Sequence, residues 1–170
     1  QRVMDVLMAF PTLLLALTIV AVLGGSVVNV LIAIGIVMTP QVARVVRGSA
    51  LSIKEAQYIE AARSIGASDG RIVGLHVIPN VAAPMIIVAT AGLARAIITE
   101  ASLSFLGMGA PPPTPSWGAD LSGLGRTYFE QAPWAAVFPG LAISIATLGI
   151  NLLGDGLRDV WDPRLRTGLR

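Results

Sequence analysis

Cysteine is absent from the 170-residue sequence, and charged side chains are scarce. Without cysteine, disulfides and thiolate metal sites are excluded. Asp, Glu, Lys and Arg together make up 13% of the residues, whereas apolar residues make up 54%. Ordinary soluble domains carry roughly twice that share of charge. So few charges would not cover the surface of a soluble domain of this size, so the composition favours a membrane protein.

Lysine and histidine each occur once, as Lys54 and His76. A phosphate-binding loop of the form G-x-x-x-x-G-K-[ST] requires a lysine directly after a glycine. Ile53 precedes Lys54, so the sequence carries no such loop, and ATP hydrolysis would have to come from a separate protein. With no cysteine and no acidic residues at ligand spacing, His76 is not expected to bind a metal. The sequence predicts a chain that is not an enzyme and that holds no cofactor.

Four apolar stretches are long enough to cross a bilayer, for which roughly 17–25 residues are needed. They cover residues 6–23, 27–46, 81–98 and 134–153. Pro11 and Pro84 near two of their starts are tolerated, because neighbouring helices and Ser/Thr groups can satisfy the freed carbonyls. The alternative is a soluble all-α protein that buries these stretches, but four of them would be hard to keep in solution. We predict an all-α integral membrane protein, a polytopic bundle of about four transmembrane helices.

Basic residues fall on one side of this map. Those from the end of the second stretch to the start of the third, and those after the fourth, are Arg44, Arg47, Lys54, Arg63, Arg71, Arg158, Arg164, Arg166 and Arg170. The Pro-rich connection 107–133 has only Arg126. Because cytoplasmic loops carry the excess of Lys and Arg, we expect both termini and the loop 51–79 to be cytoplasmic and the 107–133 loop extracytoplasmic. This topology accounts for the pI of 9.7 better than nucleic-acid binding does.

The cytoplasmic loop has helical spacing in its first half. The apolar residues at positions i, i+1, i+4 and i+7 are Tyr58, Ile59, Ala62 and Ile65, which predicts one apolar face. Gly66 follows, where a left-handed residue is expected to end the helix. Ser68 resembles the N-cap of a second short helix, which should end before Pro79. Such a helix could dock into a groove on a partner, or it could lie on lipid headgroups.

Three strings of the sequence carry a family resemblance. The string Glu60-Ala61-Ala62, followed by Gly66, Ile72, His76 and Pro79, resembles the EAA loop of permeases of ATP-binding cassette importers. The strings EASLSFLGMGAPPPTPSWG (100–118) and NLLGDGLRDVWDPRLR (151–166) resemble the C-type permease subunit of the dipeptide, oligopeptide and nickel branch. The resemblance covers essentially all 170 residues, and the three strings in this order are strongly specific.

The resemblance implies a function and a set of partners. It implies a type I importer permease that moves peptides, or nickel or another small solute, by alternating access. In such a permease the loop residues named above couple to separate ATPase subunits. A second permease subunit in a heterodimer, an extracytoplasmic solute-binding protein and the lipid bilayer are further partners, in the inner membrane of a bacterium or archaeon. Family members usually have six spans, so we expect an N-terminal portion to be missing here.

Two ionisable residues, Arg95 and Glu100, lie in or just beyond the outer half of the third stretch. Ionisable groups in a span are costly and by default mark a pathway, although a structural or interfacial ion is the alternative. Five residues apart on a helix, they are not expected to pair directly. Together with Pro40, they are the features that favour the other candidate function, a secondary transporter or channel driven by an ion gradient. No inverted repeat is evident.

Overall fold

A computed structural model describes residues 1–161, and every regular element in that range is helical. In chain order the elements are α1 (Arg2–Met8), α2 (Thr12–Leu23), α3 (Val27–Lys54), α4 (Gln57–Ser64), α5 (Asp69–Ile72), the π-helix η1 (Val73–Val77), α6 (Ile78–Phe105), α7 (Trp117–Asp120), the π-helix η2 (Leu121–Gly125) and α8 (Trp134–Trp161). The end of the 151–166 string lies outside the described residues.

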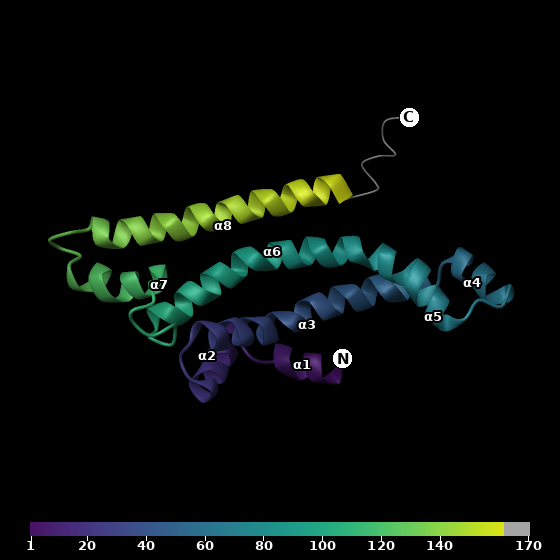
Figure 1. The fold of residues 1–170 in the computed structure, drawn as a ribbon, viewed down its shortest axis with the longest axis horizontal. Helices are drawn as coiled ribbons and strands as arrows, with labels where there is room; N and C mark the ends of the chain where they lie inside the picture. The colour runs from purple at the N-terminus through teal and green to yellow at the C-terminus, as the bar shows by residue number, and fades with distance from the viewer. Residues whose placement is uncertain (162–170) are drawn as a thin grey trace.

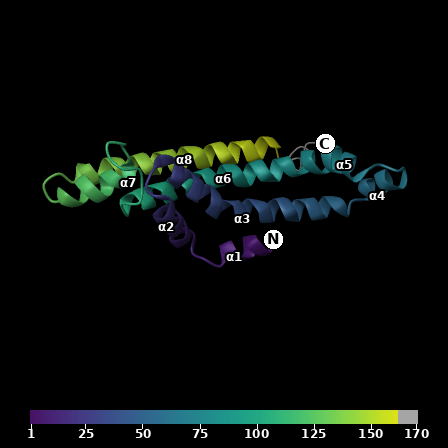
Figure 2. The ribbon, with the colours of Figure 1, turned by 60° about the horizontal axis from the view of Figure 1, so that its bottom comes forward.

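Three long helices run side by side and give the molecule its elongated shape (Figure 1 and Figure 2). Helix α6 lies between α3 and α8 and packs against both, while α2 packs on α3. Each of the three has 28 residues, or about 42 Å at 1.5 Å per residue. That exceeds the roughly 30 Å of a bilayer's hydrocarbon core, so each helix is long enough to cross it and extend beyond it.

A small apolar core joins α2, α3 and α6. Its buried members are Ala16, Val20, Val30, Ala33, Ile34 and Leu103. Many large apolar side chains outside this core are exposed, and the most apolar stretch of α8 buries none of its residues within the chain. A helix with apolar side chains on all of its faces is typical of a membrane span. The fold is therefore an all-α integral membrane bundle, with three helices long and apolar enough to span and a fourth candidate in the α1–α2 pair.

The first apolar stretch, residues 6–23, is not one straight helix. Helices α1 and α2 meet at a bend of 100°. Pro11 precedes α2 with a non-helical ψ of 129°, and proline disfavours helical geometry in the residue before it. The N-terminal piece α1 instead lies along α3, where Arg44 Nη2 contacts Asp5 Oδ1 at 3.2 Å.

The expectation that the second helix of the loop ends before Pro79 is wrong. Helices α5, η1 and α6 follow one another without a break, as a single helical run of 37 residues from Asp69 to Phe105. Ile78, the residue that directly precedes Pro79, keeps helical angles of φ −55° and ψ −49°. Pro79 falls in the first turn of α6, where its missing N–H is tolerated, and Asn80 Nδ2 donates to the His76 carbonyl at 2.7 Å.

The Pro-rich connection 107–133 contains four prolines within five residues, at positions 111, 112, 113 and 115. It contains two short helical turns, α7 and η2, which together cover Trp117 to Gly125. Both pack against α8, and α7 also packs against α6. The connection therefore folds back onto the long helices.

Candidate functional site

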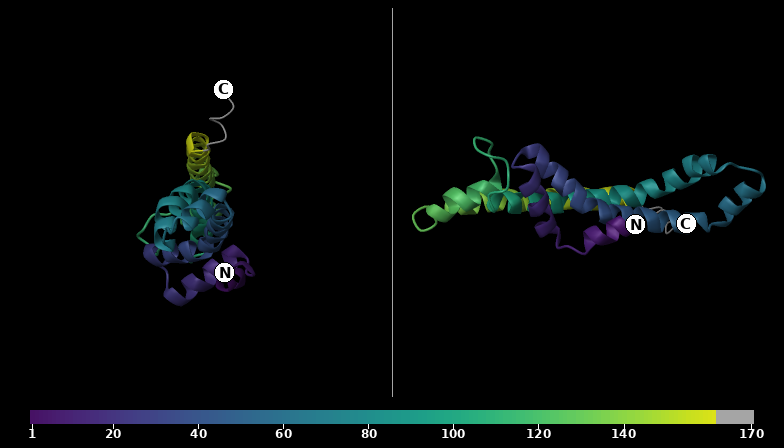
Figure 3. Two further views of the ribbon diagram at one scale, coloured as in Figure 1. Left: turned by 90° about the vertical axis from the view of Figure 1, so that its right-hand side faces the viewer. Right: turned by 90° about the horizontal axis from the view of Figure 1, so that it is seen from below.

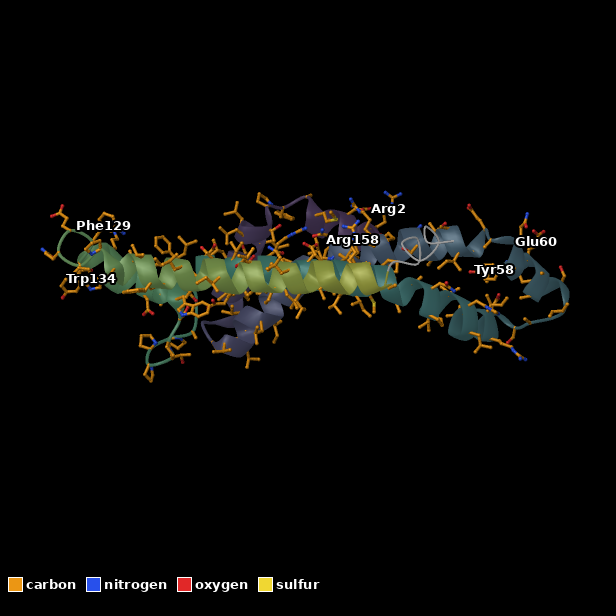
Figure 4. The ribbon with its side chains drawn as sticks, turned by 90° about the horizontal axis from the view of Figure 1, so that it is seen from above. Arg2, Tyr58, Glu60, Phe129, Trp134 and Arg158 are labelled. Carbon is orange, nitrogen blue, oxygen red and sulfur yellow. The ribbon has the colours of Figure 1, made fainter. Side chains whose placement is uncertain are left out.

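The two ends of the bundle carry different side chains. We call the end that holds α4 and α5 the α4 end, and the end that holds α7 and η2 the α7 end. Figure 4 places Tyr58 and Glu60 at the tip of the α4 end, and Phe129 and Trp134 at the opposite tip. Exposed aromatic rings gather at the α7 end, from Trp117, Tyr128, Phe129 and Trp134. The candidate functional residues are therefore divided between two sites.

Helix α4 projects beyond the last described turn of α8 (Figure 3). One side chain, Ile59, anchors it, with 1% of its surface exposed. Ile59 and the buried Ile72 of α5 both line a cavity of about 430 Å³ between the end of α3, α4 and η1. The cavity also receives the basic side chains of Arg47, Lys54 and Arg63.

The left-handed residue expected at Gly66 is confirmed by its φ of +83°. Gly66 N–H donates to the Arg63 carbonyl at 2.9 Å, and Ala67 N–H donates to the Ala62 carbonyl at 3.0 Å. These two bonds satisfy the last carbonyls of α4 in the manner of a Schellman motif. Ser68 occupies the N-cap position of α5, as expected, but its side chain makes no capping hydrogen bond.

The apolar face predicted for α4 is only partly buried within this chain. Ile59 is buried and Ala62 is half-buried, whereas Tyr58 is 46% exposed and Ile65 is 86% exposed. Glu60 and Ala61 also face solvent. Helix α4 and its C-cap therefore present an exposed surface of Glu60, Ala61 and Ile65, which Tyr58 extends with the part of its ring that stays accessible.

The structure connects some of the predicted loop residues and separates others. The His76 ring packs against the Tyr58 ring, with centroids 5.9 Å apart and planes tilted by 59°. Ile72 meets Ile59 at the shared cavity. Pro79 is exposed in the first turn of α6. Sequence reasoning missed the Tyr58–His76 contact, because no spacing rule links residues on two different helices.

Arg95 and Glu100 make separate contacts. Arg95 Nη1 donates to Gln41 Oε1 of α3 at 2.6 Å. Glu100 Oε1 accepts hydrogen bonds from Ser104 Oγ at 2.6 Å and from Ser116 Oγ at 3.2 Å. The two residues thus do not pair with each other, and each instead links α6 to a different part of the molecule.

Glycines tighten the α7 end around Glu100. A Cβ on Gly118 would collide with the backbone carbonyl of Ala101, and one on Gly109 would collide with Ser104. A Cβ on Gly25 would come within 2.9 Å of the Gly109 carbonyl oxygen. The α2–α3 connection, the segment that follows α6, and α7 are therefore closely packed at this end, beside a cavity of about 500 Å³ that Glu100, Asp120 and Trp117 help to line.

Within the described part of the chain, no group of three His, Asp or Glu side chains lies close enough together to hold a metal ion. Two features of the arrangement are suited to binding and movement. The α4 end offers a partly covered helix, and the body of the bundle offers one guanidinium, that of Arg95, bonded across two long helices.

Comparison with known proteins gives one family. The family described as "Binding-protein-dependent transport system inner membrane component" matches residues 1–167. A Brucella suis protein provisionally named a peptide transport system permease is 53% identical over 166 residues, which is 98% of this chain and 56% of that protein. The dipeptide transport system permease protein of Alkalihalophilus pseudofirmus is 46% identical over 98% of this chain and 55% of its own.

A third relative is the glutathione transport system permease protein of Escherichia coli. It is 50% identical over 166 residues, which is 98% of this chain and 54% of that protein. The chain thus spans about half the length of the curated relatives that it matches.

Proposed function

Because this chain belongs to the family of binding-protein-dependent transport system inner membrane components, we propose that it forms part of the permease of an ATP-driven peptide importer. Two relatives about half identical to it are named for dipeptide and glutathione transport. Those names favour peptides over nickel as the substrate class. They also favour an importer powered by a separate ATPase over a transporter or channel driven by an ion gradient.

The observation that carries this proposal is the uncovered surface of α4. The helix is eight residues long and is held to the chain by Ile59, while Ile65 stays 86% exposed beside Glu60 and Ala61. Docking of an amphipathic helix into a groove needs only a few apolar anchors and small residues that allow close approach. The partner that we propose for this surface is the ATPase subunit.

The continuous helical run from Asp69 to Phe105 gives the coupling a mechanical route. The contacts between the ATPase and α4 differ between the ATP-bound and ATP-free states of the ATPase, so ATP binding favours one position of α4 over the other. Through the Tyr58–His76 contact and the Ile59–Ile72 cavity, a shift of α4 displaces the start of that run. Because α6 packs against both α3 and α8, its displacement rocks the bundle between inward-open and outward-open states.

We propose that the α4 end is cytoplasmic and the α7 end extracytoplasmic, in the inner membrane of a bacterium or archaeon. Arg2 and Arg158 lie at the α4-side ends of their helices, and the exposed aromatic rings lie at the other end (Figure 4). That distribution follows the positive-inside rule and the interfacial preference of Trp and Tyr. The C-terminus is then cytoplasmic, and the α7 end faces the solute-binding protein. A second permease subunit completes the transmembrane path.

Of the two ionisable residues of α6, Arg95 is the better candidate for that path. Its guanidinium is exposed and has a single hydrogen-bonded partner among the described side chains, Gln41. Glu100 is half-buried, and two serine hydroxyls already occupy one of its oxygens. Those bonds favour a structural role for Glu100, fastening α7 to α6.

The absence of cysteine in this stretch makes a crosslinking test direct. In the full-length protein, Ala61→Cys should crosslink to a cysteine in the docking cleft of the co-expressed ATPase, and the yield should change with ATP. The matched control is Gln131→Cys, which is exposed at the α7 end. It should give no crosslink to the ATPase and should react with an impermeant thiol reagent added from outside. If Ala61→Cys gives no crosslink in an otherwise intact complex, α4 rests on lipid and the coupling role fails.

A further inference from the structure

Arg95 is a charged residue in the middle of an apolar helix. It lies 10 residues before the end of α6 at Phe105, or about 15 Å along the axis. The neighbouring residues are Leu93, Ala94, Ala96 and Ile97. A charge at such a depth is costly unless it faces a water-filled cavity or finds a polar partner. An arginine on the surface of a soluble protein carries no such cost, so the charge of Arg95 at this position requires a specific explanation.

The partner that the structure supplies is Gln41, at 2.6 Å. Gln41 follows Pro40, in the polar interruption Thr39-Pro40-Gln41 of α3. Thr39 next to it turns its hydroxyl onto its own helix, where it donates to the Gly35 carbonyl at 2.7 Å. Gln41 is thus the side chain of this interruption that reaches across to α6.

Gln41 orients the guanidinium without neutralising it. An arginine side chain has five N–H donors in a rigid, planar fork, and the bond to Gln41 uses one of them. The ion pairs among the described side chains are Arg44–Asp5 and Arg63–Asp69, and neither of them includes Arg95. The Arg95 guanidinium is thus held in place, exposed and charged. Its planar geometry matches that of a carboxylate, which it can bind through two parallel hydrogen bonds.

We propose that Arg95, oriented by Gln41, binds the carboxylate of the peptide while it crosses the membrane. The inference rests on the proposed function and adds to it the chemical group that the path recognises. A peptide presents at least one carboxylate, which has to leave bulk water on its way across. A fixed guanidinium at that depth replaces part of its hydration. Because the contact forms only in transit, it acts on the rate of transport.

The test compares a dipeptide with its C-terminal amide. The full-length transporter, with its ATPase subunits and binding protein, is reconstituted in vesicles, and uptake of Ala-Ala and of Ala-Ala amide is measured for wild type and Arg95→Gln. For each peptide the ratio of variant to wild type is taken, so that any preference of the binding protein cancels. We expect the variant to lower uptake of the free acid about tenfold or more, since hydrogen bonds between charged groups are the strong class. Uptake of the amide should stay within about twofold.

Two further variants sharpen the result. Arg95→Lys keeps the charge but loses the fork, so uptake of the free acid should fall by an intermediate factor. Gln41→Leu should lower it less than Arg95→Gln, in the same direction. Arg126→Gln, an exposed arginine at the α7 end, is the matched control and should leave the ratio of acid to amide unchanged.

Each contrary outcome is distinct. An equal loss of both peptides in Arg95→Gln would mean that the guanidinium is structural or pairs with a carboxylate of the second permease subunit, and would overturn the inference. Unchanged uptake of both would overturn it as well. If wild-type vesicles take up neither Ala-Ala nor glutathione in an ATP-dependent way, the proposed function itself fails, and the inference falls with it.

Discussion

The two ends of the bundle are built on opposite principles. At the α7 end the chain is packed closely against itself. Leu103 is completely buried, and Ser116 Oγ donates a hydrogen bond to Glu100 Oε1. Gly118 lies so close to the Ala101 carbonyl that a Cβ would not fit between them. At the α4 end one helix projects from the bundle and is anchored by a single buried side chain, that of Ile59. The salt bridge at this end joins Arg63 and Asp69, whose side chains are 50% and 87% exposed. Surface ion pairs of that kind contribute little stability.

The difference indicates which end is completed by a partner. Backbone-to-backbone contacts leave no room for alternative packing, because close-packed regions do not deform continuously. A helix held by one side chain and a turn has a lower cost of local displacement. We therefore expect substitutions at the α7 end to act on folding, and substitutions on the uncovered face of α4 to act on coupling.

The largest effect expected from this comparison is that of Gly118→Ala. The added methyl group would collide with the Ala101 backbone, which cannot move as the tip of a long side chain can. Overpacking of this kind costs about 3 kcal/mol or more. Membrane insertion and thermal unfolding in detergent should both show a loss of folded protein.

Gly123→Ala is the matched control for this prediction. Gly123 lies five residues further along, in η2, with nothing within 4 Å of an added Cβ. It should unfold within a few degrees of wild type. Equal stability of the two variants would mean that the contacts at the α7 end are not tight, and would remove the contrast between the ends.

Two isoleucines, Ile59 on α4 and Ile65 at its C-cap, provide the second test. Ile59→Ala removes the buried anchor and should destabilise the loop by about 2–4 kcal/mol, so that limited proteolysis cuts it faster. Ile65→Ala removes a side chain that is 86% exposed and should change stability by less than about 0.5 kcal/mol. It should nevertheless lower ATP-dependent uptake, because it removes a contact with the ATPase. Normal uptake by Ile65→Ala would show that this face of α4 docks nowhere.

The helical bundle and the turn at Gly66 could be predicted from the sequence, because both rest on local signals. Apolar length identifies long membrane helices, and a glycine after a periodic helical stretch predicts a left-handed end. The unbroken helix through Pro79 could not be predicted in the same way. Proline biases the residue before it only statistically, and at the first turn of a helix its missing N–H costs little.

The candidate site was predicted as a set of residues but not as a geometry. The sequence pointed to Glu60, Ala61, Gly66 and His76 on the loop, and to Arg95 and Glu100 on the third span. It contained no signal for the partners that decide what they do. Gln41 lies 54 residues from Arg95, and Ser116 lies 16 residues from Glu100 across a proline-rich turn. Such contacts depend on how whole helices pack, which periodicity does not describe.

Gly66→Ala is expected to cost less stability than Gly118→Ala or Ile59→Ala, and it separates conformation from packing. An added Cβ would meet no atom within 4 Å, but the φ of +83° is strained for any L-residue. That strain costs about 1–2 kcal/mol, which is confined to the end of α4, so the protein should still insert. Because the turn sets the direction in which α4 points, ATP-dependent uptake should fall several-fold.

Gly70→Ala, four residues along in α5, also has open space around the new Cβ but no positive φ, and serves as the control. It should leave uptake close to that of wild type. If both variants transport normally, the orientation of α4 does not matter for coupling. If both fail equally, the open α4 end tolerates side chains no better than the packed α7 end does, and the two ends are not built differently.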